Sequence, residues 1–147
     1  ARITDGGELW VTLLTPTPDA SNQISCGARA YDALDGSRNM ATFDLAGIPS
    51  LGANVNLQLR GFPDTQTARV LLGTTPLAED YAMSGLSSLV GDIFNQITTT
   101  TDASGSANIP FTVPPHSALI GRHFYLQAVA IGPVSVASNG LEVVICQ

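Results

Sequence analysis

Lysine is absent from this sequence of 147 residues, and its six arginines are scattered from Arg2 to Arg122. Twelve acidic residues outweigh them and give a formal net charge of −6. A protein that binds nucleic acid needs clustered cations, because these displace counterions from the phosphates. We therefore expect neither nucleic acid nor an anionic membrane surface as a partner.

Long apolar runs are also absent. None approaches the roughly 20 residues with which a helix spans a bilayer, so we expect no membrane insertion. The sequence begins with Ala1 and contains no positively charged, apolar leader. A secreted chain whose signal peptide has been removed has this form, as does a trimmed chain. We expect an extracellular or cell-surface location.

Histidine is scarce, with only His116 and His123. A Ser-His hydrolase needs a histidine oriented by a carboxylate, and neither histidine lies in a matching motif. Zinc requires three or four converging ligands, whereas these histidines are seven residues apart and remote in sequence from both cysteines. The sequence therefore predicts no catalytic residue, no cofactor and no zinc site, and we interpret the protein as non-enzymatic.

Two polar turns leave calcium open as a ligand. They lie at 19–22 and at 32–39, where Asp, Asn and Ser residues crowd together. Neither follows the alternating acidic calcium loop that ends in Glu. Because these residue types also cap turns, we favour turn capping over a metal site at both places.

Cysteine occurs only twice, as Cys26 and Cys146. An even count in a chain of secreted form predicts a disulfide. A bridge within the chain would close almost all of it into one loop, which is worth on the order of 4 to 5 kcal/mol in the chain-entropy model. We predict this bridge, with two free thiols or a bond between subunits as the alternatives.

Turn and strand residues are plentiful. Fourteen glycines and nine prolines separate short segments that are rich in β-branched and aromatic residues. Within 54–62, Val55, Leu57 and Leu59 alternate with polar residues, as is typical of a half-buried antiparallel strand. We predict an all-β fold, an antiparallel β-sandwich of immunoglobulin-like or jelly-roll-like type, as a single domain over residues 1–147. The expected strands are 8–15, 23–31, 40–45, 54–62, 68–72, 97–101, 107–113, 123–131, 134–137 and 141–146.

One stretch, from residue 78 to residue 96, is the least strand-like part of the chain. Leu86, Leu89, Val90 and Ile93 have roughly helical spacing there. We therefore expect one short helix near 84–94.

Several segments share their order and approximate spacing with a known module. These are Ile48-Pro49-Ser50-Leu51-Gly52, Ala68-Arg69-Val70-Leu71-Leu72-Gly73, Thr100-Thr101-Asp102-Ala103-Ser104-Gly105-Ser106-Ala107, Leu119-Ile120-Gly121-Arg122-His123-Phe124-Tyr125-Leu126-Gln127 and Ser138-Asn139-Gly140-Leu141-Glu142-Val143. Over about residues 44–145 the chain resembles a β-rich module common at the C-terminal ends of secreted proteins of planctomycetes and related environmental bacteria. The resemblance implies a secreted β-rich fold and brings no catalytic residues with it.

Two of these segments have turn chemistry. Asp102-Ala103-Ser104-Gly105 predicts a turn in which the aspartate accepts local amide hydrogen bonds and the glycine takes a positive φ. Ser138-Asn139-Gly140 predicts a tight turn before the last strand.

The first 43 residues lie outside this resemblance, and we expect residues 1–18 to form an N-terminal extension or an exchanged strand. The strand that we expect to pair with the open edge of a neighbouring subunit consists of Glu8, Leu9, Trp10, Val11, Thr12, Leu13 and Leu14. We predict a non-enzymatic extracellular structural protein, a self-associating sandwich subunit of a fibre, sheath or surface layer. Its partners would then be further copies of the same chain.

The alternative is a glycan- or protein-binding adhesion module. Carbohydrate binding commonly uses an exposed aromatic platform, for which the sequence offers Trp10, Tyr31, Tyr81 and Tyr125. Large aromatic residues mostly serve cores and interfaces, so we expect Trp10 to pack under the first strand. Exposure of Trp10 or Tyr125 would favour the glycan.

Overall fold

The computed structural model describes residues 2–3, 9–10, 26–31, 40–80, 87–130, 132 and 135–147. Within these ranges the chain forms ten strands and one 3₁₀ turn, which confirms the all-β prediction. The elements are β1 (Arg2–Ile3), β2 (Leu9–Trp10), β3 (Gly27–Tyr31), β4 (Thr42–Ala46), β5 (Asn54–Arg60), β6 (Thr67–Asp80), β7 (Ser87–Thr100), β8 (Ala107–Thr112), η1 (Ser117–Leu119), β9 (His123–Ala130) and β10 (Val136–Val144). No helix in the described ranges has the length and apolar character needed to cross a bilayer.

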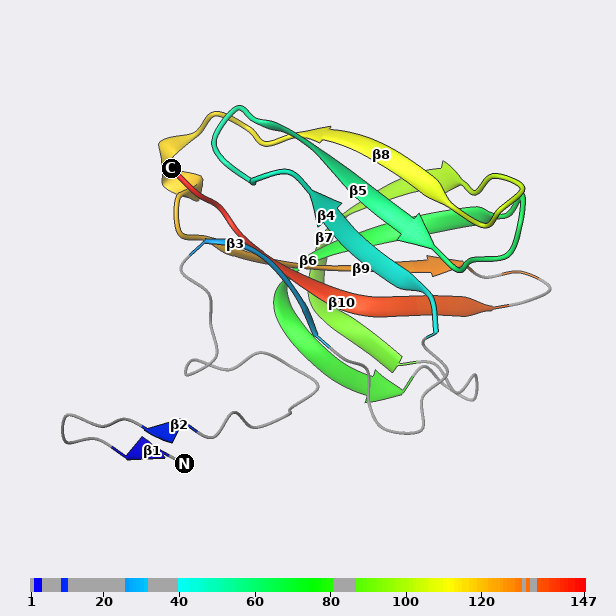
Figure 1. Ribbon diagram of the computed structural model, residues 1–147, viewed down its shortest axis with the longest axis horizontal. Helices are drawn as coiled ribbons and strands as arrows, with labels where there is room; N and C mark the ends of the chain where they lie inside the picture. Colours follow the sequence, from blue (N-terminus) through cyan, green and yellow to red (C-terminus); the bar gives the residue numbers. More distant parts are fainter. Residues whose placement is uncertain are drawn as a thin grey trace.

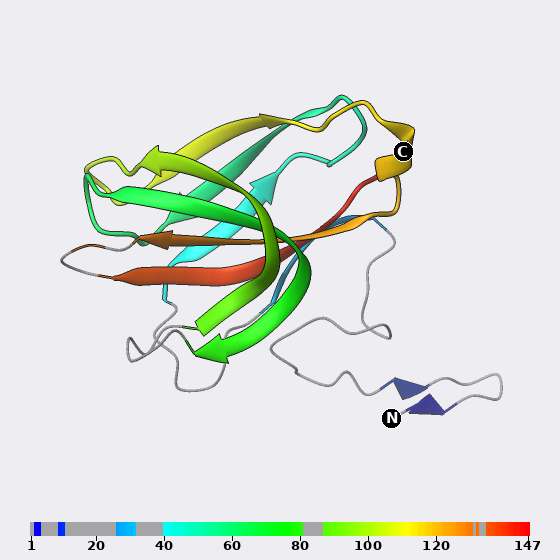
Figure 2. The ribbon, with the colours of Figure 1, turned by 180° about the vertical axis from the view of Figure 1, so that it is seen from behind.

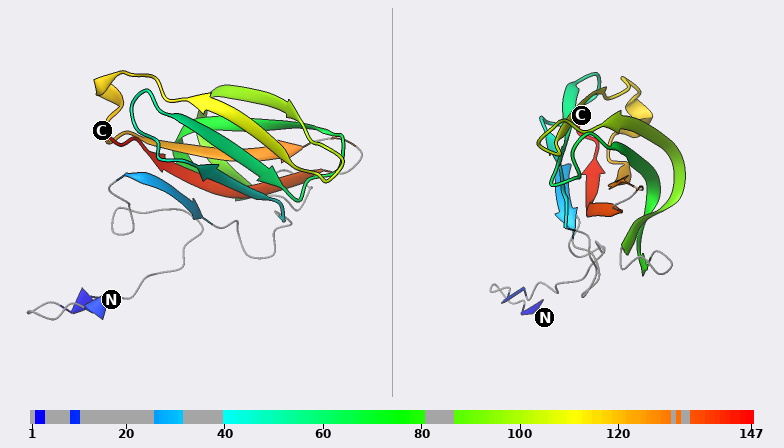
Figure 3. Two further views of the ribbon diagram at one scale, coloured as in Figure 1. Left: turned by 45° about the horizontal axis from the view of Figure 1, so that its top comes forward. Right: turned by 90° about the vertical axis from the view of Figure 1, so that its right-hand side faces the viewer.

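Two antiparallel sheets lie face to face, so the predicted β-sandwich is confirmed (Figure 1). The larger sheet has the strand order β3-β10-β9-β6-β7, and the smaller has the order β4-β5-β8. Strands β1 and β2 pair with each other in a separate two-stranded sheet. In Figures 1 to 3 this small sheet lies apart from the sandwich.

The core between the two sheets follows from the period of two in each strand. In β5, Val55, Leu57 and Leu59 are buried, whereas Asn54 and Asn56 are exposed, as the alternation predicts. The larger sheet contributes Val70, Leu72, Leu126, Ala128, Leu141 and Val143 to the same core. Each buried Val or Leu side chain of this set stabilises the fold by about 1.5–3 kcal/mol when it leaves water, which makes this the main stabilising layer.

The turn predicted at Asp102 is confirmed. Its Oδ1 accepts hydrogen bonds from the hydroxyl of Ser104 at 2.6 Å, the N–H of Ser104 at 2.8 Å and the N–H of Ser106 at 3.0 Å. These donors, the Ser104 hydroxyl foremost, hold the pKa of Asp102 below its usual value, because they favour the ionised carboxylate. Gly105 has φ of 76°, the left-handed conformation that the turn requires.

The turn predicted at Ser138-Asn139-Gly140 is wrong, because these residues lie inside β10. The pairing of β10 with β9 changes register between Ala137 and Gly140, so a bulge joins what were expected to be two strands. The Asn139 side chain reaches across to β4, where Nδ2 donates to the carbonyl of Phe43 at 3.0 Å and Oδ1 accepts from its N–H at 2.9 Å. The side-chain amide thus makes the two hydrogen bonds that the backbone of a paired strand would make, and it links the two sheets.

The helix expected near 84–94 is also wrong for the described residues 87–94, which belong to β7; residues 84–86 lie outside the described ranges. Leu89 and Val90 are both buried, although neighbouring residues of a regular strand face opposite ways. The pairing of β6 with β7 changes register between Pro76 and Glu79, next to this pair. A bulge and a strongly curved strand, rather than a helical stripe, produced the spacing.

The hairpin of β6 and β7 bends sharply near Gly73. Leu72 pairs with Asn95 and Gly73 with Ile93, so Phe94 is the extra residue of a β-bulge. A Cβ atom on Gly73 would overlap the carbonyl oxygen of Gly91, so only glycine permits this close approach. Beyond the bend, residues 74–80 and 87–92, here called the arm, curl across the outer face of the larger sheet (Figure 2; Figure 3, right).

We predict that Gly73→Ala lowers the free energy of unfolding by about 1–3 kcal/mol, because backbone must shift to admit the methyl group. Thr74→Ala, at the exposed neighbouring position, is the control and should cost under about 0.5 kcal/mol. Urea unfolding followed by circular dichroism measures both values. Equal losses in the two variants would contradict the close approach at the bend.

Candidate functional site

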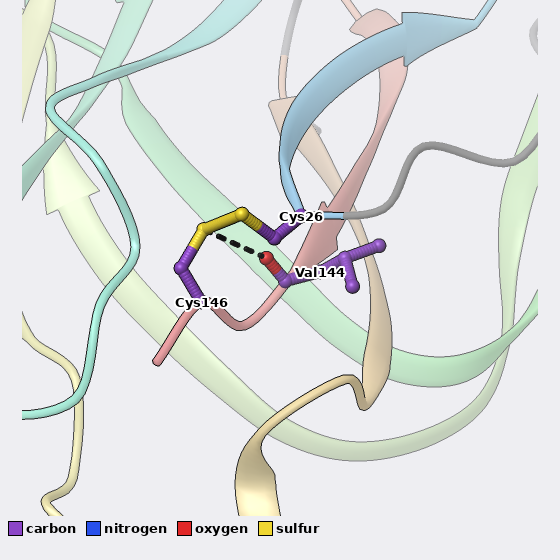
Figure 4. The surroundings of a disulfide bond; sticks show 3 residues. All are labelled: Cys26, Val144 and Cys146. Carbon is purple, nitrogen blue, oxygen red and sulfur yellow. Dashed lines mark hydrogen bonds between the residues drawn. A yellow bond between two sulfur atoms is a disulfide. The ribbon is translucent and has the colours of Figure 1, made fainter.

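The two cysteines form a disulfide within the chain, as predicted (Figure 4). Their Cα atoms are 5.1 Å apart, and the bridge ties the residue before β3 to the end of the chain after β10. Beside it the N–H of Cys146 donates to the carbonyl of Pro49 at 2.9 Å. The bridge thus fixes the start of β3 beside the segment that follows β10.

The predicted assembly strand is described only in part. Leu9 and Trp10 form β2, which pairs with Ile3 and Arg2 of β1. Glu8 and residues 11–14 lie outside the described residues, so the role of this strand stays a prediction. The two polar turns, at 19–22 and 32–39, also lie outside the described residues, so the choice between turn capping and calcium stays a prediction.

The aromatic platform is not formed by the tyrosines that the structure describes. Tyr31 and Tyr125 are 6% and 5% exposed and contact each other edge to face, with ring centroids 6.3 Å apart. Tyr125 is therefore not the exposed ring that a glycan site would use. Tyr81 and the side chain of Trp10 lie outside what the structure describes.

The two histidines lie in different settings. His116 is exposed and precedes η1. His123 begins β9, and its Nδ1 lies 3.2 Å from Oε2 of Glu142. Among the described residues, no group of three or more His, Cys, Asp or Glu side chains is placed to hold a metal ion.

Glu142 is the centre of a buried polar cluster on the outer face of the larger sheet. Its side chain is fully buried, and its Oε1 forms an ion pair with Nη2 of Arg29 at 3.1 Å. Besides His123, the Tyr125 hydroxyl donates to Oε2 at 3.3 Å. A carboxylate without solvent contact is costly unless paired, so this cluster stabilises the charge and offers it to no outside substrate.

The arm packs on one side of this cluster. Leu89 and Val90 of the arm pack with Tyr31 and Tyr125. The N–H of Leu89 donates to Oε1 of Gln127 at 3.0 Å, and the Tyr31 hydroxyl donates to the carbonyl of Leu89. Since both bonds are buried, they hold the arm to the sheet in a fixed position.

The pKa values of both tyrosines reflect this cover. Burial raises the pKa of Tyr31 well above its usual value, with the negative charge of Glu142 and the nearby Tyr125 adding to the effect. Burial is also the main cause of the raised pKa of Tyr125, and the charge and the hydrogen bond of Glu142 raise it further. Both hydroxyls therefore stay protonated and act as donors.

Sequence reasoning missed Glu142, because a charged residue between Leu141 and Val143 is typical of an exposed face. One signal pointed to the cover: both faces of β9 are apolar, as in a strand that is covered on each side. The sequence did not predict which segment covers this face, because that segment comes from the stretch in which a helix was expected.

A second feature is an apolar cleft of about 440 Å³ between the two sheets. Its lining includes Phe94 and Phe124 from the larger sheet and Leu57, Phe111 and Val113 from the smaller sheet and its following loop. Asn95 and Thr112 are the polar members of the lining, and no charged residue belongs to it. The size lies within the range of ligand-binding pockets, and the lining suits an apolar occupant.

The cleft opens between the edge strands β7 and β8. Each of these strands pairs on one side only in the described part of the chain, β7 with β6 and β8 with β5. Phe94, the bulge residue, is 56% exposed and contacts Phe124 edge to face, with ring centroids 6.0 Å apart. The arm bends away to the outer face at this point (Figure 2), and none of its residues lines the cleft.

The chain was compared with protein families, curated proteins and solved structures, and none of the three comparisons finds a match.

We predict that replacing both cysteines, Cys26→Ser with Cys146→Ser, lowers the free energy of unfolding by about 4–5 kcal/mol, because the bridge closes a loop with a sequence separation of 120. Urea unfolding of the variant and of the oxidised parent measures the loss. The parent treated with a reductant is the control and should unfold at the same urea concentration as the variant. A parent that migrates as a dimer only without reductant would contradict the bridge within the chain.

We predict that Arg29→Met lowers the free energy of unfolding by about 3 kcal/mol, because it leaves the buried Glu142 carboxylate without its ion-pair partner. Adding Glu142→Met should recover most of the loss, because no charge then stays buried. Arg60→Met, at an exposed position of β5, is the matched control and should change stability by less than about 0.5 kcal/mol. Equal losses for Arg29→Met and Arg60→Met in urea unfolding would contradict the cluster.

Proposed function

We propose that this protein is a non-enzymatic extracellular structural protein whose sandwich subunits associate with one another in a fibre, sheath or surface layer. The observation that carries the proposal is the open apolar cleft between β7 and β8. Apolar surface and unpaired strand edges at one place are the usual ingredients of association between chains.

The remaining surface supports the same proposal. Charged residues make up only 12% of the sequence, so much of the surface is left uncharged. Met40 and Ile48 are 85% and 69% exposed, and they add apolar area outside the cleft. The disulfide fits an oxidising compartment outside the cell.

An adhesion module that binds another protein is the second candidate, and the same cleft favours it. A glycan is less well supported, because the cleft lining is almost entirely apolar and Tyr125 is buried. Association of the purified chain with itself separates the two candidates, because adhesion to a different protein leaves the pure chain monomeric.

We predict that the purified full chain forms particles whose mass grows with protein concentration, and that raising the salt concentration does not dissolve them. The reason is that an apolar contact persists in salt that screens ionic contacts. Sedimentation velocity and electron microscopy measure mass and shape. Monomers at every concentration would overturn the proposal, and dissociation in salt would point to an ionic interface instead.

A further inference from the structure

The cleft has the properties of an acceptor for an additional strand. The β7 edge that borders it pairs with no further strand in the described sheet order. On this edge the N–H of Gln96 donates to Oδ1 of its neighbour Asn95, at 2.9 Å, and not to another strand. On the other border, β8 contains Pro110, which has no N–H to offer a further strand. A strand entering the cleft is therefore expected to pair with β7.

The N-terminal segment at residues 8–14 has the complementary pattern. In an extended strand, Leu9, Val11 and Leu13 point to one face, and that face carries no charge. A cleft lined by aliphatic and aromatic side chains suits such a face. Thr12 lies on the opposite face, together with Trp10 and Leu14.

The described part of the segment is only weakly held in its own chain. In the described residues, Leu9 and Trp10 pair with the two residues of β1 and with no other strand. A two-stranded ladder of this length is marginal in water, so it competes poorly with burial in a cleft.

The attachment point also fits. Residues 15–25 connect the segment to Cys26, and eleven residues reach at most about 40 Å. Cys26 is bonded to Cys146, whose neighbour Ile145 lines the cleft. Cys26 therefore lies at the end of the sandwich where Ile145 lines the cleft, and a segment tethered to it by eleven residues has the length to reach a subunit stacked on that end.

We infer that residues 8–14 of one copy pair with the β7 edge of the next copy and insert Leu9, Val11 and Leu13 into its cleft. This inference rests on the proposed self-association and names its acceptor and donor. The two surfaces differ, so each copy uses its segment on one neighbour and its cleft on another. Such a head-to-tail contact builds an open filament rather than a closed pair.

The donor and the acceptor can be disabled separately in the full chain. Val11→Asp places a charge on the inserted face, and Thr12→Asp places the same charge on the opposite face as its control. Phe94→Asp places a charge at the cleft rim, and Ile93→Asp is its control, because Ile93 is also exposed but does not line the cleft. Sedimentation velocity gives the particle mass for each variant, and circular dichroism reports whether each is folded.

We expect Val11→Asp and Phe94→Asp each to be monomeric at concentrations where the parent and both controls form filaments. A mixture of the two variants should form dimers and nothing longer, because one supplies the only intact cleft and the other the only intact segment. Filaments of Val11→Asp alone would overturn the inference while leaving self-association intact. A mixture that stays monomeric would also overturn it, and would place the segment in the cleft of its own chain. A parent that never assembles would instead defeat the proposed function.

Discussion

The bend in the β6–β7 hairpin is the constraint on which the rest of the structure depends. It exists because Gly73 lies against the backbone of Gly91, where no side chain fits, and because Phe94 is an extra residue in the ladder. The bend sends the arm over the outer face of the larger sheet. On that face the arm packs on Tyr31 and Tyr125, next to the buried Glu142, while on the opposite side of the sheet the cleft stays open. One local irregularity thus shapes both faces of the larger sheet.

These two faces have opposite consequences. Beside the arm, the Glu142 carboxylate forms an ion pair with Arg29 and accepts a hydrogen bond from Tyr125, while Tyr31 donates to the arm itself, and these buried interactions fix the sheet in one geometry. The disulfide and the Asn139 side chain add further ties between distant segments. The sandwich is therefore rigid where it is covered, which allows a cleft to persist at its uncovered edge. A rigid acceptor loses little conformational entropy when a strand enters it.

Much of the fold could be predicted from the sequence where local patterns decide it. The alternation around Val55 and Leu57 gave a half-buried strand, and the turn at Asp102 followed from side-chain hydrogen bonds within four residues. The errors occurred where distant segments decide the outcome. The spacing around Leu89 came from a bulge and from contacts with Tyr31, which lies 58 residues away. Glu142 contacts Arg29 of β3 and Tyr125 of β9, and residues of both sheets line the cleft, so no local pattern in their own strands could reveal either feature.

The central claim is that the β7 edge at the cleft is free in a single subunit and paired in an assembly. Hydrogen–deuterium exchange of the full chain, measured in dilute and in concentrated solution, tests it most directly. The account predicts that those amides of residues 94–97 that face away from β6, that of Gln96 among them, exchange rapidly in dilute solution and become protected on assembly, while those of the central strand β5 are protected in both. Assembly without any change in the exchange of residues 94–97 would contradict it.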